Sequence, residues 1–219
     1  MAYTTPSPAT NKNALTYQAI NYYNNANNTY FALGKTSAWG TNDIPTNPTS
    51  TDNIQEIFGY LKPSVDLCYQ VASSQDNTTI QFGNIYLEPT SIDKAYTNHA
   101  NYIYYTATLS PDDFTSANSF RQVGLSLNVH TNNTGLVVPA TDVLNAGYLH
   151  YLYNRIPITI SNDEDYIISS LVQIKSIDDA NAGTTTTSAT TQVTTSQTKT
   201  TRKEWLNDKG RFDYWSLLW

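Results

Sequence analysis

The chain has few charged residues and a single cysteine. Lys, Arg, Asp and Glu together make up 14 % of its 219 residues, and the formal net charge is −6. In soluble proteins about a quarter of the residues are usually charged. An acidic net charge gives no positive field that would attract a polyphosphate backbone. We therefore expect no nucleic-acid partner. One cysteine, Cys68, excludes an internal disulfide framework, and its place on an alternating apolar stripe favours a buried structural thiol.

Long apolar runs are also missing from the sequence. No stretch approaches the roughly 18 apolar residues that a membrane-spanning helix needs. A positively charged start followed by an apolar segment, the pattern of an export signal, is not present either. These two absences predict a protein that neither enters a membrane nor is exported.

The motif that comes nearest to a cofactor site is Gly34-Lys35-Thr36, which follows an apolar run as a phosphate-binding loop would. Such a loop needs a second glycine five residues before Gly34 to supply backbone N–H groups, and Thr29 stands there. The sequence therefore indicates a turn at the end of a strand that directs Trp39 against a core. We predict no cofactor.

Catalytic and metal-binding patterns are similarly absent. The chain has three histidines, His99, His130 and His150. None of them lies in a sequence signature of a hydrolase or a metalloenzyme. The acidic turn of residues 163–165 lacks the glycine and the terminal glutamate of a calcium loop, so we interpret it as a solvated hairpin tip. We expect no catalytic residue and no metal.

The composition favours β-structure. Thr and Asn form about a quarter of the chain and Tyr contributes 17 residues; Thr and Tyr favour strands, whereas Asn favours turns. The predicted fold is mainly all-β, an antiparallel, immunoglobulin-like β-sandwich with two short N-terminal helices at 14–25 and 52–61 and an extended C-terminal tail. Eight strands are predicted, the last two forming a hairpin over 156–174: 30–33, 65–71, 80–87, 102–109, 122–129, 148–153, 157–160 and 166–174.

Composition also divides the chain into four parts. Residues 1–13 are polar and contain two prolines, which predicts a flexible arm. The sandwich domain is expected to span 14–178. Residues 179–201 are dominated by Thr and Ser and are predicted to be a linker, and 202–219 form an aromatic anchor peptide.

The anchor peptide concentrates large apolar side chains that a solvated chain end rarely carries. Burying five aromatic side chains gains roughly 1.5 to 3 kcal/mol each, but ordering some fifteen residues costs about 1 to 2 kcal/mol each, so little net affinity remains per copy. We predict that the peptide docks on another chain; the alternative is that it folds back on its own domain. The predicted partner-binding residues are Trp205, Leu206, Phe212, Tyr214, Trp215, Leu218 and Trp219.

Three sequence blocks carry a family resemblance: residues 31–39, residues 119–125 and the segment Asn154-Arg155-Ile156-Pro157. In this order the blocks resemble the baseplate wedge proteins of contractile-tailed bacteriophages, of the T-even gene-eight-product type. The resemblance assigns the following residues mainly to the fold: Phe31, Gly34, Lys35, Trp39, Phe120, Arg121, Asn154, Arg155 and Pro157.

The resemblance implies a structural virion protein without enzymatic activity, assembled in the host cytoplasm. It would be an adaptor of the baseplate wedge that links neighbouring tail proteins or tail fibres, with other baseplate or tail proteins as partners and a homodimer as an open alternative. The inserted domains of large family members are missing and the Thr-rich tail is additional. Two rival functions remain open, a carbohydrate-binding module, to which Tyr, Trp, Asn and Asp would be suited, and a glycan-cleaving tail enzyme.

Overall fold

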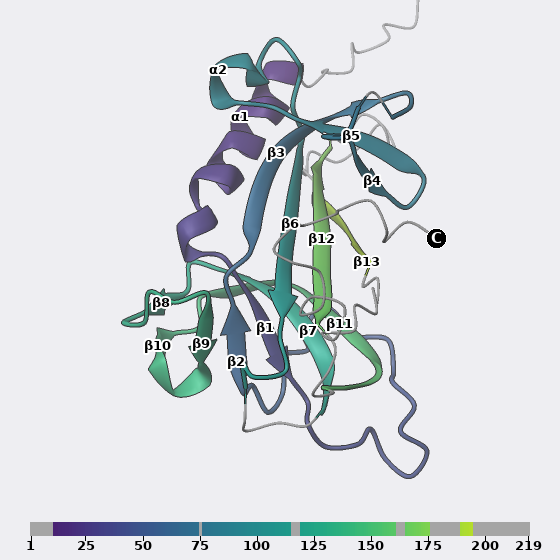
Figure 1. Ribbon diagram of the computed structural model, residues 1–219, viewed down its shortest axis with the longest axis vertical. Helices are drawn as coiled ribbons and strands as arrows, with labels where there is room; N and C mark the ends of the chain where they lie inside the picture. The colour runs from purple at the N-terminus through teal and green to yellow at the C-terminus, as the bar shows by residue number, and fades with distance from the viewer. Residues whose placement is uncertain (1–10, 75, 115–118, 161–164, 176–188, 195–219) are drawn as a thin grey trace, which may run out of the picture.

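The chain forms two antiparallel β-sheets that pack as a sandwich, one of them curled into a half-barrel (Figure 1). The computed structural model describes residues 11–74, 76–114, 119–160 and 165–175, and the backbone of 189–194. The mainly-β sandwich predicted from composition and alternation is thereby confirmed. The immunoglobulin-like type stays a prediction.

The five-stranded sheet holds, in spatial order, β11 (Tyr148–Thr159), β7 (Ser119–Leu127), β1 (Tyr30–Gly34), β2 (Gly59–Leu61) and β9 (Val137–Pro139). The six-stranded sheet holds β13 (Ala189–Thr194), β12 (Tyr166–Ile174), β6 (Tyr102–Leu109), β3 (Ser64–Val71), β5 (Ile85–Pro89) and β4 (Ile80–Phe82). A small third sheet pairs β10 (Val143–Asn145) with β8 (His130–Thr131).

Alternating side chains build the core between the two large sheets. In β6, Ile103 and Tyr105 point into the main cluster, which also receives Phe31 and Phe120 from the five-stranded sheet. The intervening Tyr102 belongs to a second cluster on the other face of the six-stranded sheet. This period of two is what a strand with both faces partly covered requires.

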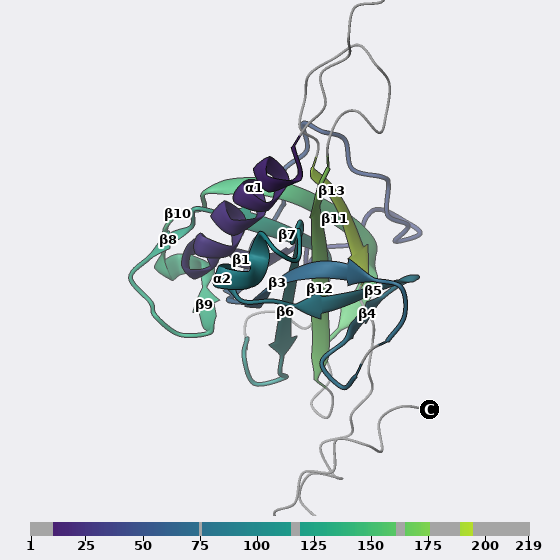
Figure 2. The ribbon, with the colours of Figure 1, turned by 90° about the horizontal axis from the view of Figure 1, so that it is seen from above.

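Helix α1 (Lys12–Asn24) covers one side of this core (Figures 1 and 2). The Asn11 side chain accepts a hydrogen bond from the Asn13 N–H and so caps the helix. Ala19 and Ile20 are buried in the main cluster. The predicted helix at 14–25 is confirmed, although it starts two residues earlier, inside the predicted N-terminal arm. A single turn, α2 (Ile92–Ala95), and two 3₁₀ turns (Ala26–Asn28 and Ala140–Asp142) complete the described helices.

The second N-terminal helix, predicted at 52–61, is wrong. Asp52 accepts the N–H of Thr49, which precedes it, and therefore does not cap a following helix. Glu56 has a positive φ of 48°, which a right-handed helix excludes. The Phe58 N–H donates to Leu33 on β1, so the backbone here is engaged by another strand and ends in β2.

The predicted hairpin over 156–174 is also wrong. Strand β11 pairs with β7 in the five-stranded sheet, whereas β12 pairs with β6 in the six-stranded sheet. The chain therefore crosses from one sheet to the other between Thr159 and Tyr166, a span in which residues 161–164 lie outside the described structure. Pairing with strands that are distant in the sequence determines the sheet to which each of the two strands belongs. The local sequence does not encode this pairing.

Smaller differences concern strand boundaries. The run 80–87 is a two-strand hairpin, β4–β5, in which Gly83 takes a positive φ of 58° at the two-residue turn. The segments 148–153 and 157–160 join into the single strand β11, with register shifts between Leu149 and Tyr151 and between Asn154 and Ile158. Part of the predicted linker, Ala189–Thr194, pairs with β12 as strand β13, since β-branched Thr and Val can extend a sheet as well as form a linker.

Candidate functional site

A loop of residues 35–58, between β1 and β2, lies at one end of the molecule and is fastened to the sheet beside it (Figure 1). Its main attachment is Arg121 on β7. The Arg121 Nε and Nη2 atoms each donate to the Asp43 carboxylate at 2.7 Å, and Nη1 donates to the Thr36 carbonyl oxygen at 2.7 Å. Such a fork of donors fixes orientation as well as distance. The hydrogen bonds from Arg121 hold the pKa of Asp43 below its ordinary value.

Trp39 makes the second attachment. Its backbone N–H donates to Asp43 at 2.9 Å, and its indole Nε1 donates to the carbonyl oxygen of Arg155 on β11, also at 2.9 Å. The Lys35 ammonium lies 5.6 Å from the centre of the indole ring, within cation–π range. Trp39 therefore joins the loop to the edge strand of the sheet.

Glu56 closes the loop at its base. Its carboxylate accepts hydrogen bonds from the Ser37 N–H at 2.8 Å and the Thr36 hydroxyl at 2.9 Å, and it pairs with Lys35 at 3.2 Å. The pKa of Glu56 is lowered to about 2, and the hydrogen bonds from Ser37 are the largest cause. Lys35 and Thr36 of the Gly-Lys-Thr motif thus bind a carboxylate of their own chain.

Two amide side chains complete the attachment. Gln122 accepts the Gln55 N–H at 2.7 Å and donates to Asn154 at 2.8 Å. Asn154 in turn donates to the Thr46 carbonyl oxygen at 2.9 Å. The loop is therefore held at its start, middle and end by side chains from β7 and β11.

The structure places the nine residues singled out by the family resemblance around this loop and the core beneath it. Phe31 and Phe120 are fully buried in the main core. Gly34 lies where a side chain would meet the Gln55 carbonyl oxygen, and Pro157 is exposed within β11. The remaining five take part in the contacts that fasten the loop: Lys35, Trp39, Arg121, Asn154 and Arg155.

Sequence reasoning missed three partners in this arrangement, Asp43, Glu56 and Gln122. Asp43 and Arg121 are 78 positions apart, and neither lies in a periodic pattern that would connect them. The clustering of loop-forming residues around Asp43 indicated a loop but not its contact. The predicted partner-binding residues of 202–219 lie outside the described residues.

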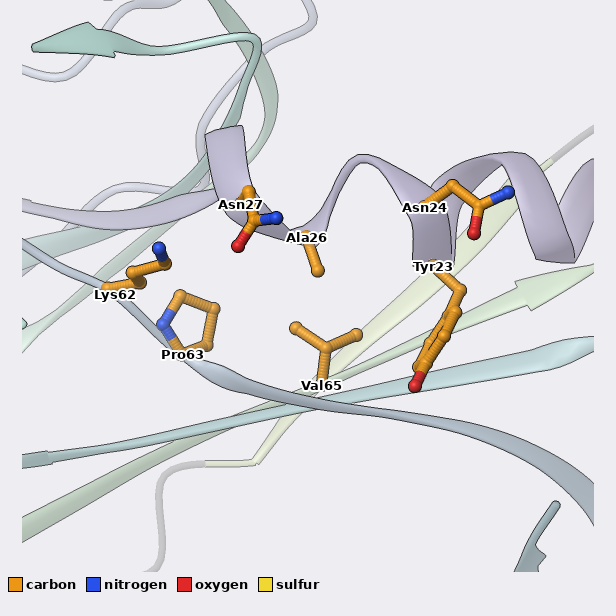
Figure 3. Close-up of a pocket in the computed structure, with 7 residues that line it drawn as sticks. All are labelled: Tyr23, Asn24, Ala26, Asn27, Lys62, Pro63 and Val65. Atoms are coloured by element: carbon orange, nitrogen blue, oxygen red, sulfur yellow. The ribbon is translucent and has the colours of Figure 1, made fainter. Parts of the chain in front are cut away.

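The protein also has a shallow pocket of about 330 Å³ between the end of α1 and the start of β3 (Figure 3). Ala26, Pro63 and Val65 line it with apolar groups, and Tyr23, Asn27 and Lys62 contribute polar groups. In Figure 3 the Asn24 side chain points away from the others. Ligand sites usually have several polar groups that converge on the ligand, and this pocket offers few of them.

The remaining titratable side chains form no metal site in the part of the chain that the structure describes: no three His, Cys, Asp or Glu side chains gather there as metal ligands. Cys68 is buried, as expected, and burial raises the pKa of its thiol. His150 packs edge-on against the Tyr22 ring. No helix in the described part of the chain is both long and apolar enough to cross a membrane.

Comparison with known proteins identifies the class to which this sandwich and its anchored loop belong. The model of the family described as baseplate wedge 3 tail fiber network component matches residues 7–174, and the chain is a member of that family. The protein is similar to virion protein 3 of Enterococcus phage phiEF24C, with 29 % identity over 153 residues that cover 67 % of this chain and 83 % of the relative. It is therefore a structural protein of a phage tail or baseplate. The family match ends at the last residue of β12. The narrower likeness to the T-even gene-eight-product type stays a prediction.

Proposed function

We propose that this protein is a non-enzymatic adaptor of the baseplate wedge, which links neighbouring tail proteins or components of the tail-fibre network. Family membership over residues 7–174 carries this proposal. The anchored loop supports it, because an adaptor needs contact surfaces that are rigid before binding. Assembly in the host cytoplasm and residence in the virion follow from the same role.

The aromatic peptide 202–219 supplies a contact of a different kind. It follows the part of the chain that matches the family, and its apolar side chains favour burial against a preassembled surface. In this proposal the peptide docks on a partner chain. Several copies acting together would compensate for the small affinity of each.

Native mass spectrometry of the full chain with the neighbouring proteins of its baseplate tests the adaptor role. The expected result is a stoichiometric complex that a variant lacking 202–219 no longer forms, while the thermal midpoint of that variant stays within about 2 °C of the full chain, a shift below 1 kcal/mol. A large fall in the midpoint would instead mean that the peptide folds back on its own domain. Failure of the full chain to form any such complex would contradict the adaptor role.

The pocket beside α1 favours one second candidate, carbohydrate binding. Its lining includes amide, phenol and ammonium groups beside apolar ones, and a sugar can use both kinds. Binding to a glycan array that an Asn27→Ala variant loses would favour this function, and no saturable binding would exclude it. Hydrolysis of any glycan would favour the tail-enzyme alternative.

A further inference from the structure

The anchored loop and the strand β11 that holds it carry exposed apolar side chains and a positive charge that has no counter-ion among the described residues. Ile44 in the loop is 67 % exposed and Ile156 on β11 is 66 % exposed. Two hydrogen bonds bring the loop and the strand together beside them, from Asn154 to Thr46 and from Trp39 to Arg155. We call Trp39, Ile44, Tyr153, Arg155 and Ile156 the loop–β11 surface.

Arg155 is the unusual member of this surface. Arg155 is half-buried as a residue, and its Nη1 atom is buried without a hydrogen-bond partner. Nε makes a single contact, of 3.3 Å, to the neighbouring Ile156 carbonyl oxygen. Burial lowers the pKa of Arg155, an effect that the nearby Tyr153 opposes. Arg121, by contrast, is paired in full with Asp43.

A half-buried cation between exposed apolar groups is costly unless a carboxylate is brought to it. The two isoleucines add apolar area that a binding partner can cover, since both are exposed among the described residues. The fitting occupant is therefore a segment in which an acidic residue lies between large apolar ones.

The chain itself contains such a segment. In the peptide 202–219, Asp213 stands between Phe212 and Tyr214, with Trp215 next to them. Strand β13 ends at Thr194, opposite Ser169 near the start of β12.

The chain leaves β13 at the end of the molecule that carries the loop–β11 surface. Tyr166, the first residue of β12, donates to the Thr159 carbonyl oxygen at the end of β11, at 2.5 Å. Residues 195–201, when extended, reach about 25 Å. The peptide of the same copy, or that of a second copy that approaches this end, is therefore within reach of the surface.

We propose that the loop–β11 surface of one copy binds the peptide 202–219 of a second copy, with Asp213 of that peptide paired with Arg155. This inference rests on the proposed docking of the peptide on a partner chain and names the partner surface. Two copies that exchange peptides in this way form a closed, two-fold contact.

Charge exchange in the full-length protein tests the pairing, with self-association measured by sedimentation equilibrium over a concentration series. Arg155→Glu and Asp213→Arg, each alone, are expected to weaken association at least tenfold, because each places like charges together. The double variant is expected to restore association to within about threefold of the unchanged protein, because the pair is re-formed with reversed signs. Ile92→Asp is the matched control, since Ile92 is 44 % exposed on α2 at the far end of the molecule (Figure 1) and should leave association unchanged.

Ile44→Asp and Ile156→Asp provide a second set that changes exposed side chains only, and each is expected to weaken association while circular dichroism shows an intact fold. The proposal is overturned if the unchanged protein is monomeric at all concentrations, if the single charge variants associate normally, or if the double variant fails to recover. In any of these cases a complex with other virion proteins would still uphold the adaptor role, so the two proposals fail separately.

Discussion

At the scale of single residues, Gly34 shows how little room separates the loop from the sheet. A Cβ atom at this position would lie 2.3 Å from the Gln55 carbonyl oxygen and 2.9 Å from Ile54 Cγ1. Gly34→Ala should therefore displace residues 54–55 and lower the free energy of unfolding by about 1 to 3 kcal/mol. Chemical denaturation measures the change. An unaltered midpoint would show that the loop is not held tightly against β1.

Arg121 is the second position at which a single side chain decides the loop's attachment. Lysine keeps the charge but cannot reach both Asp43 and the Thr36 carbonyl oxygen with a planar fork. Arg121→Lys should therefore leave the sandwich folded while making residues 35–58 several-fold more sensitive to limited proteolysis. Lys94→Arg on α2 is the control, with no expected change. Equal protease resistance of both variants and the unchanged protein would contradict the attachment.

At the scale of elements, the base of the loop should respond to acid through Glu56. Its folded-state pKa of about 2 lies below the ordinary value of 4.5, so the unfolded chain binds a proton first as the pH falls. The contribution of Glu56 is complete above about pH 4.5 and is lost as the pH approaches 2. The protection factor of the Ser37 N–H against amide exchange should fall across this window, because that N–H donates to Glu56. Glu56→Gln should abolish that dependence, and an unchanged pH profile in this variant would contradict the assignment.

Some secondary-structure elements could be predicted from the local sequence and others could not. The alternation of Val65, Leu67 and Tyr69 predicted β3, because the face that packs on the main core imposes a period of two. The segment 52–61 imitated a helix through its capping pattern and apolar spacing, yet β1 and β7 engaged its backbone. The sheet to which β11 and β12 belong, and the contact of Asp43 with Arg121, depend on pairings between distant residues that no local pattern encodes.

At the scale of the whole molecule, His150 links stability to pH nearer neutrality. It packs against Tyr22 of α1, and burial lowers its pKa below the ordinary 6.5. The unfolded chain therefore takes up a proton first as the pH falls, and stability is lost progressively below about pH 6.5. Thermal midpoints between pH 7 and 5 should fall, and His150→Phe should reduce this fall. A steeper fall in the variant would contradict burial of the imidazole as the cause.

We propose that the protein is a structural adaptor whose sandwich stays folded while its C-terminal peptide is buried against another chain. A density map of the intact phage particle tests this most directly. The map should place the sandwich in the baseplate wedge, with residues 202–219 ordered against a neighbouring chain. A peptide packed on its own sandwich, or a sandwich located outside the baseplate, would contradict it.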